Sequence, residues 1–278
     1  MKIYLIVLCA IVFQFSFSQQ YDSVIIENDN IDSNNRIYKP GNVFVYNYEI
    51  IQNDKSYKLK NNGRKLNREK MIREIDFKLS PKNSDSIAVE KIHLIVQPVS
   101  NEIRTNENQT QISYIQDPLF DSFSSTGAVE NESNVWIHPI RAGFFNSLET
   151  APFPFAKMPL KIGLEWHDQM LIGENWGNEL WGKWPGSLLL TYDYKVTDKK
   201  SIKSEIGNIE CYIIESTAKS SIGTTKLTSY FSERYGFVKL NYELLNGLNV
   251  NFWLIEYKTG KEFNDLQTFF KTKQYIKQ

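Results

Sequence analysis

The sequence contains little of what most active sites are built from. Its 278 residues include only two Cys and three His. His93, His138 and His167 lie far apart along the chain, and none has the neighbouring ligands that a zinc site of three or four residues needs. A spaced Ser or Cys nucleophile motif and a glycine-rich phosphate loop are also missing. The sequence therefore names no reaction, and it predicts no metal and no cofactor.

Net charge is also absent, because 32 basic residues balance 32 acidic ones. No run of Lys and Arg forms a basic patch, so binding to nucleic acid has no electrostatic support. The same balance argues against an anionic membrane surface as the main partner.

Long apolar runs are missing after the N-terminus. At the N-terminus, Lys2 precedes an apolar run over residues 3–17. Small residues stand near the end of this run, at Ser16 and Ser18. This order is typical of a secretory signal peptide, and the run is too short for a convincing membrane span. We predict a signal peptide over 1–18 that is cleaved after Ser18. The mature chain is then expected to be periplasmic or secreted, without a transmembrane segment.

Cysteine usage fits export without requiring a disulfide. A lipoprotein would need Cys9 as its lipid-bearing residue, but bulky Leu8 precedes it and Cys9 lies within the apolar run. Removal of residues 1–18 leaves Cys211 alone, so no intramolecular disulfide can form. Cys211 lies in an alternating strand pattern, which favours a buried structural thiol over a nucleophile.

A two-residue alternation dominates the last third of the chain. In "LLLTYDYKVT", at 188–197, apolar and aromatic residues alternate with polar ones. The same period returns at 209–215, 227–231, 237–245 and 250–257, with turn signals between these stretches. The spacing predicts an antiparallel meander, in which one face of the sheet can stay in water.

The N-terminal half combines weaker strand patterns with polar stretches. Residues 19–40 lack any period and predict a flexible leader. β-Branched and aromatic runs predict strands at 43–51, 71–79 and 87–97. Between the first two, a stretch rich in Lys and Asn predicts a solvated connection with a turn at Asn62-Gly63.

Together these patterns predict one β domain over residues 41–260. We expect a mainly β fold with an antiparallel, strongly curved sheet, either a half-barrel or a sandwich. Residues 134–186 hold five of the six Trp and predict an aromatic, loop-rich cover over its opening. Residues 261–278 predict a short amphipathic tail helix, with apolar residues at Phe263, Leu266, Phe270 and Tyr275.

The order of motifs over 134–245 resembles a pattern in uncharacterised exported bacterial proteins. The pattern begins with "WIHPIR" at 136–141 and ends with "YGFVKL" at 235–240. Ile140 stands where the pattern usually has a second Pro. That family implies no activity. The second half also resembles the meander of half-barrel periplasmic proteins, which include carriers of lipid-bearing cargo, and this likeness implies a fold but no function.

His138 is the leading catalytic candidate. Because Pro139 follows it, the backbone of His138 is held extended or in a turn. Beside Arg141 and Glu149, His138 would serve as the general acid or base of a hydrolase. The alternative is a structural corner, in which His138 is hydrogen-bonded inside the fold and Arg141 pairs with a carboxylate.

Aromatic residues of segment 134–186 are the candidates for ligand binding. Their ring faces offer apolar area to sugar rings or acyl chains, but the same side chains also fill the open mouth of a curved sheet. The candidates are Trp136, Phe153, Phe155, Trp166, Trp176, Trp181 and Trp184.

We therefore expect an exported binding or scaffold protein of the bacterial envelope. An apolar concavity in the sheet would hold a lipid, an acyl chain or a protein partner. One alternative is a hydrolase centred on His138. The other is a carbohydrate-binding module that uses Trp176, Trp181 and Trp184. The identity of the ligand and the oligomeric state stay open.

Overall fold

The structure is a computed structural model that describes residues 24–27, 31–67, 72–82, 88–117 and 123–259. The predicted signal peptide at 1–18 and the predicted tail helix at 261–278 lie outside the described residues. Within the ranges given above, no helix is both long and apolar enough to cross a membrane.

Fourteen strands and four short 3-10 helices make up the described chain. The first seven strands are β1 (Val43–Gln52), β2 (Lys55–Asn67), β3 (Ile72–Pro81), β4 (Lys91–Val96), β5 (Thr110–Asp117), β6 (Phe123–Glu130) and β7 (Asn134–Ile137). The others are β8 (Phe155–Lys157), β9 (Glu165–Gly173), β10 (Ser187–Ser204), β11 (Gly207–Ser220), β12 (Gly223–Ser232), β13 (Gly236–Glu243) and β14 (Asn249–Lys258). The 3-10 helices are η1 (Asn101–Ile103), η2 (Gly143–Thr150), η3 (Glu174–Trp176) and η4 (Leu245–Gly247).

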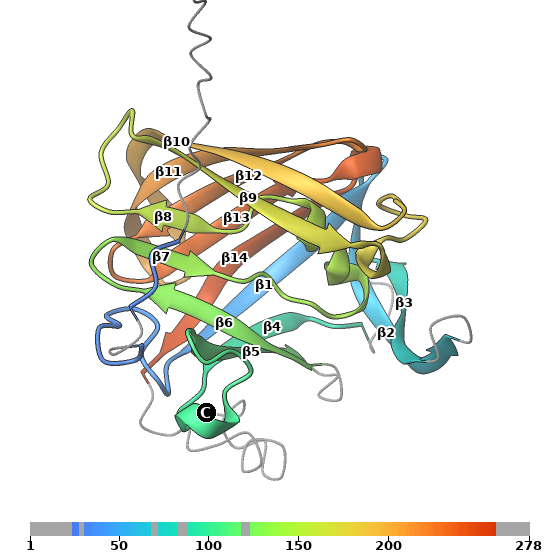
Figure 1. The fold of residues 1–278 in the computed structure, drawn as a ribbon, viewed down its shortest axis with the longest axis horizontal. Helices are drawn as coiled ribbons and strands as arrows, with labels where there is room; N and C mark the ends of the chain where they lie inside the picture. Colours follow the sequence, from blue (N-terminus) through green and yellow to red (C-terminus); the bar gives the residue numbers. More distant parts are fainter. Residues whose placement is uncertain (1–23, 28–30, 68–71, 83–87, 118–122, 260–278) are drawn as a thin grey trace, which may run out of the picture.

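These strands form one antiparallel sheet that curls into a nearly closed barrel (Figure 1). Twelve strands follow a single path in the order β8-β7-β6-β5-β4-β1-β14-β13-β12-β11-β10-β9. The β2–β3 hairpin is attached to β1 and stands at one end of the barrel. The structure confirms the prediction of a mainly β fold with a strongly curved antiparallel sheet.

The predicted meander corresponds to β10 through β14. Each of these strands pairs with the next, and the alternation in β10 turns Leu188, Leu190 and Tyr192 into the interior. Gly223, which opens β12, has a φ of +140°, and a Cβ there would lie 2.7 Å from a methyl group of Leu245. The turn into β12 therefore requires glycine.

The solvated connection predicted between the first two strands is wrong, because residues 55–67 form β2. The chain turns earlier, at Asn53 and Asp54, where positive φ values of 50° and 60° suit a two-residue hairpin. Asn62-Gly63 is a β-bulge, at which the register with β3 shifts. The polar composition of β2 hides its strand character in the sequence.

The predicted leader at 19–40 is bound to the barrel at its C-terminal end. Ile37 and Tyr38 are buried. The carboxylate of Glu130, at the end of β6, accepts the backbone N–H groups of residues 36, 37 and 38 at 2.8 to 3.1 Å. The core therefore includes residues before the predicted domain boundary at 41.

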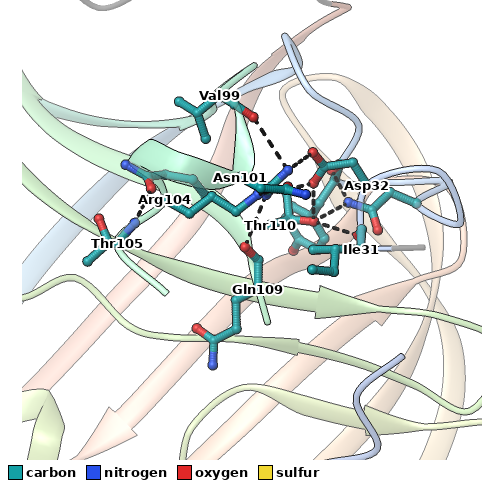
Figure 2. A network of polar contacts seen from close by, with 11 residues as sticks. Ile31, Asp32, Val99, Asn101, Arg104, Thr105, Gln109 and Thr110 are labelled. Atoms are coloured by element: carbon teal, nitrogen blue, oxygen red, sulfur yellow. Dashed lines mark hydrogen bonds and ion pairs between the residues drawn. The ribbon is translucent and has the colours of Figure 1, made fainter. Parts of the chain in front are cut away.

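A second polar network holds the same segment (Figure 2). Arg104, which follows η1, forms a two-pronged ion pair with the carboxylate of Asp32. Its guanidinium group also donates to the carbonyls of Val99 and Gln109. The side chain of Arg104 is 4% exposed. A buried cation with carboxylate and carbonyl partners joins the N-terminal segment to the loop between β4 and β5.

Aromatic side chains close the barrel where backbone pairing stops. β8 and β9 end the strand path, and no described ladder joins them. Phe155 of β8 lies edge-on to Trp166 of β9 and to Tyr194 of β10, with ring centroids 5.7 and 5.6 Å apart. Tyr194 stacks on Trp166 at 5.3 Å, and its hydroxyl donates to the carbonyl of Phe153 at 3.1 Å. We call Phe155, Trp166 and Tyr194 the aromatic closure.

Segment 134–186 combines loops with short elements of secondary structure. It supplies β7, β8 and β9 to the sheet, and η2 buries most of its side chains in the core. Phe145 of η2 lies against Tyr48 of β1 and Phe252 of β14, at 5.4 and 5.6 Å between centroids. Phe77 of β3 covers this end of the barrel by stacking on Trp181. The segment completes the barrel wall and fills its interior.

Loss of the Phe155 ring should destabilise the protein because it opens the aromatic closure. We expect Phe155→Ala to lower the free energy of unfolding by about 3–5 kcal/mol, the usual cost of truncating a buried Phe. Urea unfolding followed by tryptophan fluorescence measures this change. Leu189→Ala is the control, since Leu189 is 50% exposed on β10, and should change stability by less than about 0.5 kcal/mol. Equal losses in the two variants would contradict the closure.

Candidate functional site

The structure brings the three predicted catalytic candidates together. His138 and Arg141 lie in the corner between β7 and η2, and Glu149 lies near the end of η2. The Arg141 Nε donates to Glu149 Oε1 at 2.9 Å, and a terminal nitrogen of Arg141 donates to His138 Nε2. Between Glu149 Oε1 and His138 Nε2 the distance is 3.6 Å, too long for a hydrogen bond. Arg141 therefore bridges the other two side chains.

Both ring nitrogens of His138 are engaged. Nε2 accepts from Arg141, so the proton is assigned to Nδ1, which donates to the carbonyl of Pro139 at 2.8 Å. Burial and the neighbouring Arg141 cation lower the pKa of His138 to about 3. His138 is thus neutral at physiological pH, and neither nitrogen is free to take a proton from a nucleophile.

Glu149 is the buried acidic partner of this corner. Its side chain is 2% exposed. Burial raises the pKa of Glu149 to about 7, and the hydrogen bond and charge of Arg141 offset only part of that effect. The hydroxyl of Tyr192, on β10, belongs to the same buried region, since burial and then Glu149 raise the pKa of Tyr192.

Aromatic packing surrounds the corner. The ring of Phe153 lies 4.5 Å from that of His138 and 5.8 Å from that of Trp136. The hydroxyl of Tyr114 donates to the backbone carbonyl of His138 at 2.8 Å. These contacts have the geometry of the structural corner, which explains all three polar residues without a reaction.

Most of the predicted ligand-binding aromatics are buried. Trp176 is half-buried, and the guanidinium of Arg141 lies over its ring at 5.3 Å. The indole of Trp181 donates to the carbonyl of Trp176 at 2.9 Å. The buried candidates are Trp136, Phe153, Phe155, Trp166, Trp181 and Trp184. Their packing favours the interpretation that they fill the barrel rather than form an exposed platform.

A small apolar cavity lies among side chains inside the barrel. Its volume is about 20 Å³, and its lining includes Leu94, Leu148 and Tyr242. A space of this size corresponds to roughly one water molecule. Ligand pockets for small molecules are on the order of 300–1,000 Å³. This cavity, as the described residues line it, is therefore too small for an acyl chain.

The other two His lie in separate strands. His93 Nε2 is 3.3 Å from a carboxylate oxygen of Asp117, across β4 and β5. His167 Nδ1 is 2.7 Å from Asp193, on the outer face of β9 and β10. Among the residues that the structure describes, no group of three His, Cys, Asp or Glu side chains is placed to hold a metal ion.

Comparison with known proteins gives little further information. No protein-family model matches the chain, and no curated protein matches its sequence. Solved structures with some similarity include the hypothetical lipoprotein YmcC from Escherichia coli, at a TM-score of 0.34 and 10% identity, which covers 76% of this chain and 84% of that one.

Two further structures have a similar level of likeness. A candidate lipoprotein from Parabacteroides distasonis has a TM-score of 0.35 and 12% identity, and covers 80% of this chain and 97% of that one. A candidate exported protein with a YmcC-like fold from Bacteroides fragilis has a TM-score of 0.39 and 8% identity, with the same coverage of 80% and 97%. Because all three TM-scores are below 0.5, these likenesses carry no argument about this chain.

The buried corner should give the protein two opposing pH dependences. Between pH 4.5 and 7, folded Glu149 keeps a proton that the unfolded chain loses, so its contribution to stability falls as pH rises. Between pH 6.5 and 3, folded His138 lacks a proton that the unfolded chain binds, so its contribution falls as pH drops. From pH 4.5 to 6.5 the two contributions cancel in the wild-type protein.

Single substitutions should separate the contributions of Glu149 and His138 to the pH dependence of stability. We expect the free energy of unfolding of Glu149→Gln to decrease by about 1.4 kcal/mol per pH unit as pH falls from 6.5 to 4.5. His138→Gln should instead lose a similar amount as pH rises through that window. Urea unfolding at three pH values measures the slopes. Slopes of the same sign in both variants would show that the assigned protonation states are wrong.

Proposed function

We propose that this protein is an exported binding or scaffold protein of the bacterial envelope that acts through its outer surface. The signal-peptide pattern at 1–18 supports the export part of the proposal. The observation that supports binding at the outer surface is the contrast between the interior cavity of about 20 Å³ and a groove of about 440 Å³ outside the sheet.

The filled interior argues against one form of the expected function. A lipid or acyl chain held in a concave sheet would have to displace η2 and the aromatic residues packed around it. Phe144 and Phe145 are fully buried, and Thr225 of β12 donates to the carbonyl of Thr150 at 2.7 Å. Displacement would break this bond and expose both rings to water, which would cost several kcal/mol. A scaffold or partner-binding role requires no such change.

The hydrolase alternative receives no support from the corner. A general base needs a free lone pair near pH 7, but the Nε2 of His138 already accepts from Arg141 and its pKa is about 3. The carbohydrate alternative also loses its predicted platform, since Trp181 and Trp184 are buried.

Export and the absence of a bound lipid are both testable on the purified mature protein. N-terminal sequencing of the chain recovered from the cell envelope or medium should begin at Gln19, as the cleavage prediction requires. Organic extraction followed by mass spectrometry should then release no acyl species in a molar amount comparable to the protein. A stoichiometric lipid would overturn the filled-barrel argument, and an intact Met1 in the cytoplasm would overturn export.

A further inference from the structure

The outer face of the barrel carries a groove that no candidate residue predicted from the sequence touches. It lies between the tip of the β10–β11 hairpin, at Ile202–Ser204, and the outer face of β13 and β14. Lys82, which follows β3, also lines the groove. The volume of the groove is about 440 Å³. This exceeds the interior cavity by more than an order of magnitude.

An indole forms part of the groove wall. Phe252 and Leu254 of β14 are buried, so Trp253 between them points outward. Its strand neighbours are Lys239 on β13 and Asn47 on β1. Trp253 is half-buried, so one part of the ring is held by the protein while the rest can contact a ligand.

The groove has an excess of positive charge. Lys82, Lys203 and Lys239 line it, and Glu49 is the acidic residue among its lining side chains. Within the described ranges, none of the three lysines has an ion-pair partner.

Two uncharged side chains donate hydrogen bonds to the carboxylate of Glu49. Asn251 donates to its Oε1 and Ser56 to its Oε2, each at 3.1 Å. Glu49 is therefore bound by an amide and a hydroxyl rather than by the lysine ammonium groups. The ammonium group of Lys239 lies over the ring of Tyr230, 5.3 Å from its centroid, a contact that leaves the lysine charge unneutralised. The charges of the three lysines can therefore attract an anion from outside.

The composition of the groove separates two possible anionic partners. A membrane surface would be contacted by protruding apolar residues. The large apolar side chains that are exposed in the described chain are Ile25, Ile26, Ile103, Ile162, Leu171 and Leu189, and none of them lines the groove. A concave site with one aromatic wall suits a sugar ring, which stacks on an indole face, while ammonium groups suit acidic substituents.

We propose that the Trp253 groove binds an anionic sugar chain, with the indole against a sugar ring and Lys82, Lys203 and Lys239 against its carboxylate or phosphate groups. The inference rests on the proposed function in so far as it names a partner class for an exported binding protein. It replaces the buried tryptophans of segment 134–186 with an outward-facing one.

Calorimetric titration of the full mature protein tests this proposal. The probes are an oligogalacturonate, a phosphorylated mannose oligosaccharide and the neutral mannose oligosaccharide of the same length, at about 50 mM salt to limit screening. We expect one charged probe or both to bind at least about tenfold more tightly than the neutral one. The stronger of the two distinguishes a carboxylate-bearing from a phosphate-bearing chain.

Single substitutions test whether the charged probe binds in the Trp253 groove. Trp253→Ala, Lys203→Ala and Lys239→Ala should each weaken binding of the charged probe by about tenfold. Lys203 is exposed at a hairpin tip, so its variant tests the site even if Trp253→Ala misfolds. Trp176→Ala and Lys226→Ala are the matched controls, since Lys226 is paired with Glu243 at 3.0 Å. The controls should stay within about twofold of wild type.

Several results would overturn the proposal. These are no measurable binding of either charged probe, equal binding of the neutral probe, or unchanged binding in the Trp253 and Lys203 variants. Equal affinity for a single-stranded DNA of the same charge would indicate unspecific attraction to polyanions. Stronger, Trp253-dependent binding to vesicles of anionic phospholipid would favour a membrane partner instead. Because N-terminal sequencing tests export separately, failure here leaves the proposed export intact.

Discussion

The contact of Phe155 with Trp166 and Tyr194 is the constraint on which the barrel depends. Hydrogen bonding accounts for every neighbour in the path of twelve strands, but it ends at β8 and β9. Non-directional packing of large rings then replaces a ladder. The short edge strand β8 and the longer edge strand β9 thus meet through side chains, so the sheet closes without matching the register of its end strands.

Closure explains why polar groups inside the barrel are arranged as they are. η2 is enclosed, and its Glu149 must be neutralised or paired. Arg141 reaches it from the barrel end, where its own side chain is 36% exposed. His138 stays neutral beside that cation. The contacts of His138, Arg141 and Glu149 with one another therefore satisfy polar groups that the fold buries.

Local sequence signals predicted the parts of the structure that depend on local physics. The alternation over 188–257 predicted the meander, and the proximity of His138, Arg141 and Glu149 in the chain predicted their contact. Strand β2 was missed because its polar residues carry no apolar alternation.

Burial of the tryptophans could not be read from the sequence, since an indole suits both a core and a sugar site. Phe155 and Tyr194 lie far apart in the chain, so no periodic pattern in the sequence predicts their contact. The outward direction of Trp253 could have been found, because Phe252 and Leu254 flank it in an alternating strand.

The most direct test of the closed barrel is a distance measurement between spin labels attached to cysteines at Lys157→Cys on β8 and Gln169→Cys on β9, in a Cys211→Ser background. We predict one narrow distance distribution that added fatty acid leaves unchanged. A second, longer distance that grows with the fatty acid would show that the barrel opens, and would contradict the account.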